Sequence, residues 1–483
     1  MRRPSAITAA VLSLSLLSSC QVTPGTGQTN FNILSAEDEV KMGAEAHPDI
    51  LAQFGGAYDD PKLQAYVAGI GKRLVGSTET PASTFRFTVL NSAIVNAMAL
   101  PGGYIYVTRG LLALADDEAE LAGVVGHEIG HVTGRHTAQR YSQAMAANVA
   151  TGILGVATSI FTGVNLGDVA GLAATAYIQG YSRDQESEAD SLGIRYMNTS
   201  GWNPDYMATF LGKLRDQSRL DAVLAGRSPD SVDEFSMFAS HPRTIDRVKE
   251  AAAAAGGGRH GAVGRDLYLS HLDGMLVGDD PSEGVVRGRV FSHAGLNIRF
   301  EVPQGYRILN GSKAVTAQNA NGAVIRFDMG PEAQTDMTNY LQSQWAKGTR
   351  LSNIEAITIN GMPAATGVTR LNSNRGTFDA RLLAIKNGKS VYRVMFISPP
   401  QVTPQEAEGQ RRATYSFRHL TESEHAEIKP LRIKVITVKA GDTVENLAER
   451  LPYEDHKLER FRVLNGIAEG KGVTPGARIK IVM

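Results

Sequence analysis

Two histidines stand four residues apart in the segment GHEIGH, residues 126–131, and a glutamate lies between them. In a helix, residues four apart share a face about one turn apart, so the imidazoles of His127 and His131 point the same way. Glu128 lies about 100° further round the helix than His127. Two neutral imidazoles can bind a divalent cation while an adjacent carboxylate acts on water. The spacing therefore predicts a hydrolytic zinc site of the zincin type.

The flanking sequence supports the helix that this site needs. Asp117 and Glu120 have capping-box spacing, and an apolar helical pattern follows them. Gly126, Gly130 and Gly134 leave room around the histidines. By chance alone, His-Glu-x-x-His is expected in on the order of one unrelated chain in a hundred. A metal site is therefore favoured over coincidence.

A catalytic zinc site also needs a third protein ligand and an open fourth position. A second helical pattern follows in YSRDQESEADSLGIRYM, residues 181–197. Glu186, Asp190 and Gly193 share one face of that helix, and Glu188 and Leu192 share another. Periodicity alone does not choose between Glu186 and Glu188 as the third ligand.

Together, HEIGH (127–131) and ESEAD (186–190) resemble the HtpX/CAAX-prenyl-protease family of zinc metallopeptidases, especially its periplasmic BepA-like members. The resemblance covers roughly residues 35–250. It implies one Zn²⁺ per chain, held by His127, His131 and Glu186.

The resemblance also gives roles to residues outside the ligand set. It makes Glu128 the general base and then the general acid. Asp190 would orient a ligand histidine, and His136 would support the site through a hydrogen bond. The segment NAMALPGGYIYVTRGLL (96–112) would supply an edge strand that binds substrate backbone. The strand residues are Asn96, Ala97, Met98 and Ala99.

A further family-like segment is SHPRTIDRV, residues 240–248, which contains His241 and Arg247. From the residues alone, His241 is a histidine at a helix N-terminus with Pro242 in the first turn. The resemblance instead places His241 at the open side of the zinc. There it would stabilise an oxyanion or cap the metal in a latent state.

The N-terminus reads as a secretory signal, residues 1–19, with Arg2 and Arg3 before a short apolar run. LSSC resembles the bacterial lipobox, and Cys20 is the only cysteine in the chain. We expect a lipid-modified Cys20, a flexible tether over residues 20–34, and no disulfide. Gln21 favours anchoring to the outer membrane, facing the periplasm, over retention at the inner membrane.

Size and charge limit the class of protein. The 483 residues suggest about three domains. Lys+Arg and Asp+Glu are equal at 49 each, so no global charge favours nucleic acid. We expect a mainly helical metallopeptidase domain with a small edge sheet over residues 35–255. The Gly-rich end of the run AAAAAGGGRHGAVG predicts a linker over 256–287.

Two further modules follow the linker. Short β-type runs with two helical stretches predict an α+β sandwich over residues 288–425, whose element order resembles the PsbP/Mog1-like fold. Residues 432–483 resemble a LysM domain, a small strand–helix–helix–strand module. The resemblance implies contact with N-acetylglucosamine-containing peptidoglycan through Gly441, Asp442, Thr443 and Asn465. A purely structural role for the module is the alternative.

The Ala- and Gly-rich residues 145–180 predict a helical hairpin that is too interrupted to cross a membrane. It would serve as core packing, as a mobile lid, or as a surface that dips into the lipid interface.

These patterns predict a zinc metalloendopeptidase of the bacterial envelope. Its substrates would be misfolded or misassembled envelope proteins. The competing hypothesis is a chaperone-like outer-membrane assembly factor or peptidoglycan-binding anchor with a latent zinc site.

Overall fold

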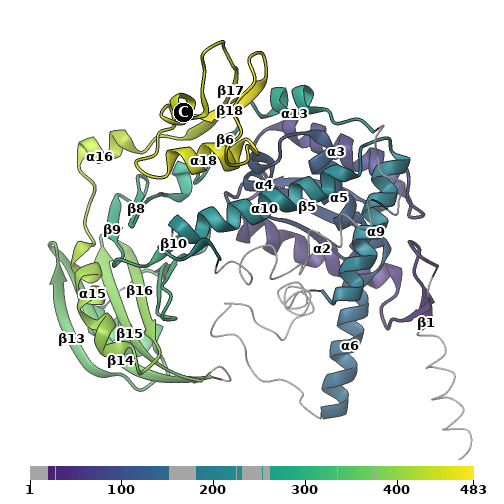
Figure 1. Ribbon diagram of the computed structural model, residues 1–483. Helices are drawn as coiled ribbons and strands as arrows, with labels where there is room; N and C mark the ends of the chain where they lie inside the picture. Colours follow the sequence, from purple (N-terminus) through teal and green to yellow (C-terminus); the bar gives the residue numbers. More distant parts are fainter. Residues whose placement is uncertain are drawn as a thin grey trace, which may run out of the picture. The chain divides into compact units, whose positions relative to one another are not determined.

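A computed structural model describes residues 20–27, 29–151, 181–224, 226–230, 253, 261–333, 335–373 and 376–483 (Figure 1). The chain forms two compact units. The first contains residues up to Leu51, Gly56–Val277 and Arg432–Met483. The second contains Ala52–Gly55 and Gly278–Leu431. The C-terminal segment therefore folds with the N-terminal part of the chain.

The first unit is mainly helical. Its helices are α2 (Ala36–Gln53), α3 (Pro61–Val75), η1 (Ala82–Thr84), α4 (Arg109–Leu114), α5 (Glu118–Thr133), α6 (His136–Thr151), α9 (Arg183–Thr199), α10 (Asp205–Leu224), α13 (Arg265–Leu272), α17 (Val444–Ala448) and α18 (Lys457–Leu464). Its strands are β1 (Cys20–Val22), β2 (Thr29–Phe31), β3 (Arg86–Leu90), β4 (Ala97–Leu100), β5 (Tyr104–Thr108), β6 (Leu276–Val277), β17 (Leu431–Thr437) and β18 (Arg478–Val482).

A small sheet lies beside α5, as the sequence predicted. Its strand order is β3-β5-β4, so β4 is an edge strand. β5 runs parallel to β3 and antiparallel to β4. One apolar core joins α3, this sheet, α5, α9, α10 and α13. In the described residues, no helix is both long enough and apolar enough to cross a membrane.

The start of α5 differs from the predicted capping box. Asp117 is the N-cap and accepts a hydrogen bond from the Glu120 backbone N–H at 2.9 Å. The Glu120 carboxylate does not return to the N-cap backbone. It accepts from the Asp116 N–H at 2.7 Å and from Lys213 Nζ of α10 at 2.9 Å. Burial and the neighbouring Glu120 carboxylate raise the pKa of Asp117 to about 7.

Residues 20–34 are not the flexible tether that their composition suggested. β1 and β2 form an antiparallel hairpin in which Cys20 pairs with Phe31. At its turn, the Gly25 N–H donates to the Thr133 carbonyl at the end of α5, at 3.2 Å. Arg195 of α9 donates to the Gly25 carbonyl at 3.0 Å. These hydrogen bonds dock the segment on the two helices that carry the predicted ligands.

The predicted linker, residues 256–287, is also structured where it is described. α13 packs in the first core, and the hydroxyl of the fully buried Tyr268 donates to the Leu112 carbonyl at 2.8 Å. β6 is the edge of the sheet β18-β17-β6. The C-terminal module has the expected strand–helix–helix–strand order, but its sheet is completed by this segment. The glycines near residue 256 predicted a linker and gave no sign that β6 would pair with β17.

The second unit is built on a seven-stranded antiparallel sheet of order β10-β11-β12-β16-β15-β14-β13. One core lies between one face of the sheet and α15, and another packs α14 and η4 on the other face. This arrangement fits the predicted α+β sandwich. The elements are η3 (Pro281–Glu283), β7 (Val285–Arg287), β8 (Val290–His293), β9 (Ile298–Glu301), β10 (Arg307–Asn310), β11 (Val315–Gln318), β12 (Val324–Gly330), α14 (Met337–Asn339), η4 (Tyr340–Trp345), β13 (Ser352–Ile359), β14 (Met362–Ser373), β15 (Gly376–Asn387), β16 (Ser390–Ser398), α15 (Thr403–Ser416) and α16 (Glu422–Glu427).

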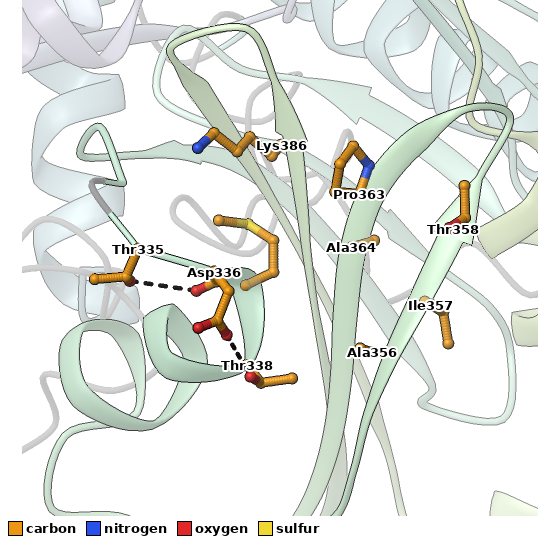
Figure 2. A pocket seen from close by; sticks show the side chains of 10 residues that line it. Thr335, Asp336, Thr338, Ala356, Ile357, Thr358, Pro363, Ala364 and Lys386 are labelled. Carbon is orange, nitrogen blue, oxygen red and sulfur yellow. Dashed lines mark hydrogen bonds between the residues drawn. The ribbon is translucent and has the colours of Figure 1, made fainter.

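A hollow of about 650 Å³ lies in this second unit, between the start of α14 and strands β13–β15 (Figure 2). Asp336, Thr338 and Lys386 give it polar groups, and Pro363 and Ala364 are part of its apolar lining. The Asp336 carboxylate is bonded to Thr338 and to the Asn339 N–H of its own helix. Among the described residues, no predicted catalytic or ligand residue lines this hollow.

The raised pKa of Asp117 predicts a pH-dependent stability. The carboxyl group of Asp117 titrates near 3.8 in the unfolded chain and near 7 in the folded protein. Its contribution to the free energy of unfolding is therefore complete below about pH 3.8 and is lost as the pH rises through 7. Asp117→Asn keeps an N-cap acceptor but does not titrate. As the pH rises from 5 to 8, we expect the free energy of unfolding of this variant to increase by about 1–3 kcal/mol relative to that of wild type. Urea unfolding at both pH values measures this. The same change at Asp60, the partly exposed N-cap of α3, is the control; equal pH responses of the two variants would contradict the assignment.

Candidate metal centre

The three predicted ligands meet in a buried cluster. His127 and His131 come from α5 and Glu186 comes from α9, and their donor atoms all lie within 4.8 Å of one another. The two Nε2 atoms are 2.8 Å apart. Glu186 carboxylate oxygens lie 3.7 Å from His127 Nε2 and 3.4 Å from His131 Nε2. All three side chains are at most 1% exposed. Of the two acids that periodicity alone left open, Glu186 lies in this cluster and Glu188 does not.

This donor set fits a tetrahedral metal ion. Ligand atoms held about 2.1 Å from a zinc ion lie about 3.4 Å from one another. The separations in the cluster bracket that value. Burial lowers the pKa of His131 well below its usual value, so its ring is neutral, as a metal ligand must be. Two imidazoles and a carboxylate are also a donor set typical of catalytic zinc.

Asp190 holds His127 from behind. Its Oδ1 lies 2.9 Å from His127 Nδ1. Asp190 is one helical turn after Glu186 on α9, so both carboxylates face α5. A carboxylate at Nδ1 keeps the proton there and leaves Nε2 free for a metal. This is the position that the family resemblance implied for Asp190.

His131 has a different support. Its Nδ1 lies 2.8 Å from Nδ1 of His136. With a metal on His131 Nε2, Nδ1–H donates to His136, whose own proton then sits on Nε2. That nitrogen lies 3.5 Å from a Glu188 oxygen, and the other Glu188 oxygen accepts from Thr26 Oγ1 at 3.1 Å. A chain of polar contacts therefore runs from the N-terminal hairpin through Glu188 and His136 to the ligand histidine.

Tyr181 is a site residue that sequence reasoning missed. Its ring stacks on His131 with centroids 3.8 Å apart and an interplanar angle of 18°. Its hydroxyl is 2.9 Å from Thr137 Oγ1, and the residue is 6% exposed. The available signal was its place directly before Ser182, the N-cap of α9. An aromatic residue there is carried to the ligand cluster with Glu186.

Glycines bring α5 and α9 into backbone contact. A Cβ added at Gly130 would lie 2.8 Å from the Ala189 carbonyl oxygen, and one at Gly193 would lie 2.9 Å from the His127 nitrogen. The sequence alone predicts that the α5 glycines leave room around the histidines. The backbone of α9 fills the space beside Gly126 and Gly130. Close approach of the helices is what allows a short carboxylate to reach both rings.

The site is closed beside His131. A cavity of only about 10 Å³ lies between His131, Arg135 and the end of β4, which is room for about one water molecule. β4 has the edge position predicted for substrate binding. Its Ala97 and Met98 are fully buried, however, and Ala99 is 4% exposed. An extended peptide can pair with this strand only after the strand is uncovered.

The remaining predicted residues are Glu128, next to the ligand His127, and residues that lie in the C-terminal module or outside the described chain. Glu128 follows His127 on α5 and is 1% exposed. His241 and Arg247, and residues 152–180 of the predicted hairpin, lie outside the described residues. Within the C-terminal module, Gly441, Asp442 and Thr443 form the turn before α17. Asn465 is buried, and its amide binds the Phe461 carbonyl and the backbone of Lys480.

Comparison with known families agrees with this geometry. Peptidase family M48 matches residues 61–255, a range that includes both helices of the cluster, α5 and α9. This part of the chain is therefore similar to peptidase family M48. The M48 domain is a metalloprotease domain, and the His127–His131–Glu186 cluster is its candidate metal site.

Curated relatives share this region. The chain is 32% identical over 252 residues to the beta-barrel assembly-enhancing protease of Yersinia pestis, covering 51% of this chain and 49% of that protein. It is 29% identical over 275 residues to the protein of that name from Escherichia coli K12, covering 55% and 54%. It is also 27% identical over 258 residues to metalloprotease YcaL of Escherichia coli K12, covering 52% and 96%. The chain thus spans about half the length of the first two relatives.

Among solved structures, cyanobacterial PsbP (CyanoP) from Synechocystis sp. PCC 6803 is similar at 12% identity and a TM-score of 0.23. The match covers 27% of this chain and 91% of that chain. A TM-score this low assigns no fold. The PsbP/Mog1-like and LysM-like descriptions therefore stay predictions.

Asp190→Asn should weaken metal binding. The variant keeps the shape of the side chain but presents His127 Nδ1 with a neutral partner, and loss of such a partner typically costs 10–100-fold in affinity. Competition with a coloured chelator for Zn²⁺ measures the change. Asp184→Asn, at an exposed position on the same helix, is the control. Equal affinity in the two variants would show that Asp190 does not act through His127.

Gly130→Ala should destabilise the first unit by about 1–3 kcal/mol, because the new methyl group overlaps the α9 backbone. Thermal or urea unfolding measures this, together with Zn²⁺ affinity, which should fall as α9 is pushed away. Gly69→Ala is the matched control, since that exposed position in α3 has open space and alanine favours helix by up to about 1 kcal/mol. A Gly130→Ala protein as stable as Gly69→Ala would refute the proposed close contact.

Proposed function

We propose that the protein is a zinc-dependent metalloendopeptidase of the His-Glu-x-x-His plus glutamate type. The supporting observation is the convergence of His127, His131 and Glu186, with Asp190 behind His127. The match to family M48 supports the same reaction. Zinc held by these three residues would act as a Lewis acid on the scissile carbonyl and activate water.

The residues of the chain have separate roles in this mechanism. Glu128 takes a proton from the attacking water and delivers it to the leaving amine, as general base and then general acid. Asp190 fixes the tautomer of His127, and His136 and Tyr181 fix the ring of His131. β4 would bind substrate backbone as an added strand once uncovered. His241 and Arg247 stay predicted contributors at the open side of the metal.

The substrates that we propose are misfolded or misassembled proteins of the bacterial envelope. Two relatives are named beta-barrel assembly-enhancing proteases, and recognition of extended backbone suits unfolded chains. Acylation at Cys20 would hold the protein at the outer membrane, facing the periplasm. The C-terminal module would contact peptidoglycan through the exposed turn at Gly441–Thr443.

A second function has its own support. The closed cavity beside His131 and the burial of β4 fit a latent enzyme that acts mainly as an assembly factor or anchor. The two hypotheses differ in cells. Retained envelope function in a strain that carries only Glu128→Gln would favour the assembly factor, and loss of function would favour the peptidase.

Glu128→Gln separates binding from catalysis in vitro. The variant should keep one Zn²⁺ per chain, because the three ligands are intact, while casein cleavage falls by about 10²–10⁴-fold with loss of the proton carrier. Elemental analysis and a cleavage assay with and without chelator measure the two effects. Glu37→Gln, at an exposed position in α2, is the control. Full cleavage by Glu128→Gln would exclude this mechanism.

A further inference from the structure

Lys480 belongs to the C-terminal module, but it is buried against residues from outside that module. In β18, Ile479 and Ile481 alternate with Lys480 and Val482, yet all four are at most 4% exposed. A strand with one solvated face would expose every second residue. Lys480 is instead fully buried, so both faces of this strand are covered.

The covering surface belongs to the peptidase domain. Lys480 Nζ donates to the carbonyls of Ala113 and Ala115, each at 2.7 Å. These carbonyls lie at the end of α4, where a helix leaves acceptors without intrahelical partners and where its dipole is negative. On the same side of the sheet, Ile433 of β17 belongs to the peptidase core. Lysine thus caps a helix that is more than 360 residues away in the sequence.

The segment between α4 and α5 adds the opposite charge. Asp116 Oδ1 lies 3.0 Å from Lys480 Nζ, and the other oxygen pairs with Lys213 of α10. Arg265 of α13 lies 3.4 Å from the same carboxylate. Burial alone would raise the pKa of Asp116, but Lys480, Lys213 and Arg265 together hold it below its usual value. Asp116 is therefore ionised and shared by three separate elements.

The geometry points to Lys480 as a positioning residue of the peptidase: it locks the C-terminal module onto the α4–α5 corner and so fixes the helix that carries His127, Glu128 and His131. This inference rests on the proposed peptidase function. Asp116 directly precedes Asp117, the N-cap of α5, and Glu120 joins the same cluster through Lys213. Movement of the corner would rotate or slide α5 as a rigid rod.

The lock also assigns a role to Asn465. Its side chain accepts from the Lys480 N–H at 2.7 Å and donates to the Lys480 carbonyl at 2.9 Å. The neighbouring Gly466 has φ +60°, and a Cβ there would lie 2.6–2.7 Å from Lys213 and Asp116 atoms. Both residues therefore help the C-terminal module to pack against the peptidase domain. The contacts of α18 with α4 and α10 agree with this packing (Figure 1).

The test uses the full chain with Lys480→Met, which keeps the length of the side chain and removes its charge and donors. We expect amide hydrogen exchange at residues 115–121 to accelerate at least tenfold. We expect kcat for casein cleavage to fall about tenfold, with KM changed less than twofold and one Zn²⁺ retained. Lys471→Met, at an exposed position in the same module, should match wild type in all of these.

A second variant keeps the test decisive if Lys480→Met fails to fold. Asp116→Asn combined with Lys480→Met removes both charges and leaves the pair of Lys213 with Glu120. Its kcat should be lower than that of wild type, because the helix cap is not restored, and higher than that of Lys480→Met if that variant folds, because the unpaired charge is gone. Wild-type kcat and exchange in this double variant would overturn the inference.

The outcomes also distinguish this inference from the proposed function. Faster exchange confined to residues 432–483, with kcat as in Lys471→Met, would overturn the lock while leaving the peptidase intact. If wild type itself shows no zinc-dependent cleavage, the proposed function fails. The exchange at residues 115–121 then still decides whether Lys480 holds the corner.

Discussion

The backbone contact between α5 and α9 is the constraint on which the site depends. Glutamate is a short ligand, and Glu186 reaches both imidazoles only because Gly130 and Gly193 let the helices meet without intervening side chains. Larger residues at these positions would separate the helix axes, which lie 8–10 Å apart in ordinary packing. The same contact brings Asp190 to His127. One packing choice therefore supplies a ligand and the partner of another ligand.

From this contact the support of the site spreads in two directions. Toward the N-terminus, His136 and Glu188 connect His131 to Thr26 in the β1–β2 hairpin. At the N-terminal end of α5, the helix begins at a buried charge cluster that includes Lys213 and Lys480, the latter from the C-terminal module. Both ends of the helix that carries His127 and His131 are thus held by segments distant in sequence. A metal site needs such support, because misplacement by about 1 Å can greatly reduce a reaction rate.

The sequence predicted what is local. Four-residue spacing placed His127 and His131 on one face, and Asp117 is the N-cap that its position before the apolar pattern indicated. Choosing Glu186 over Glu188 needed the family resemblance, since both faces of α9 carry acids and the choice depends on where α5 lies. The hydrogen bonds of Gly25 and the burial of Lys480 were not predictable, because a glycine in a polar stretch and a lysine in an alternating strand ordinarily face water. Composition describes a segment alone, whereas these residues are fixed by surfaces supplied from elsewhere in the chain.

The closed state beside His131 joins the two proposed functions. If the cleft is open for a fraction f of the time, a peptide binds with an apparent dissociation constant larger by 1/f, while the reaction of the bound complex is unchanged. The cavity of about 10 Å³ and the buried β4 are the features that an open form would have to change. An assembly factor and a peptidase can then be the same molecule at different values of f. A partner that uncovers β4 would raise cleavage without touching His127, His131 or Glu186, because a ligand shifts such an equilibrium only through its preference for the open state.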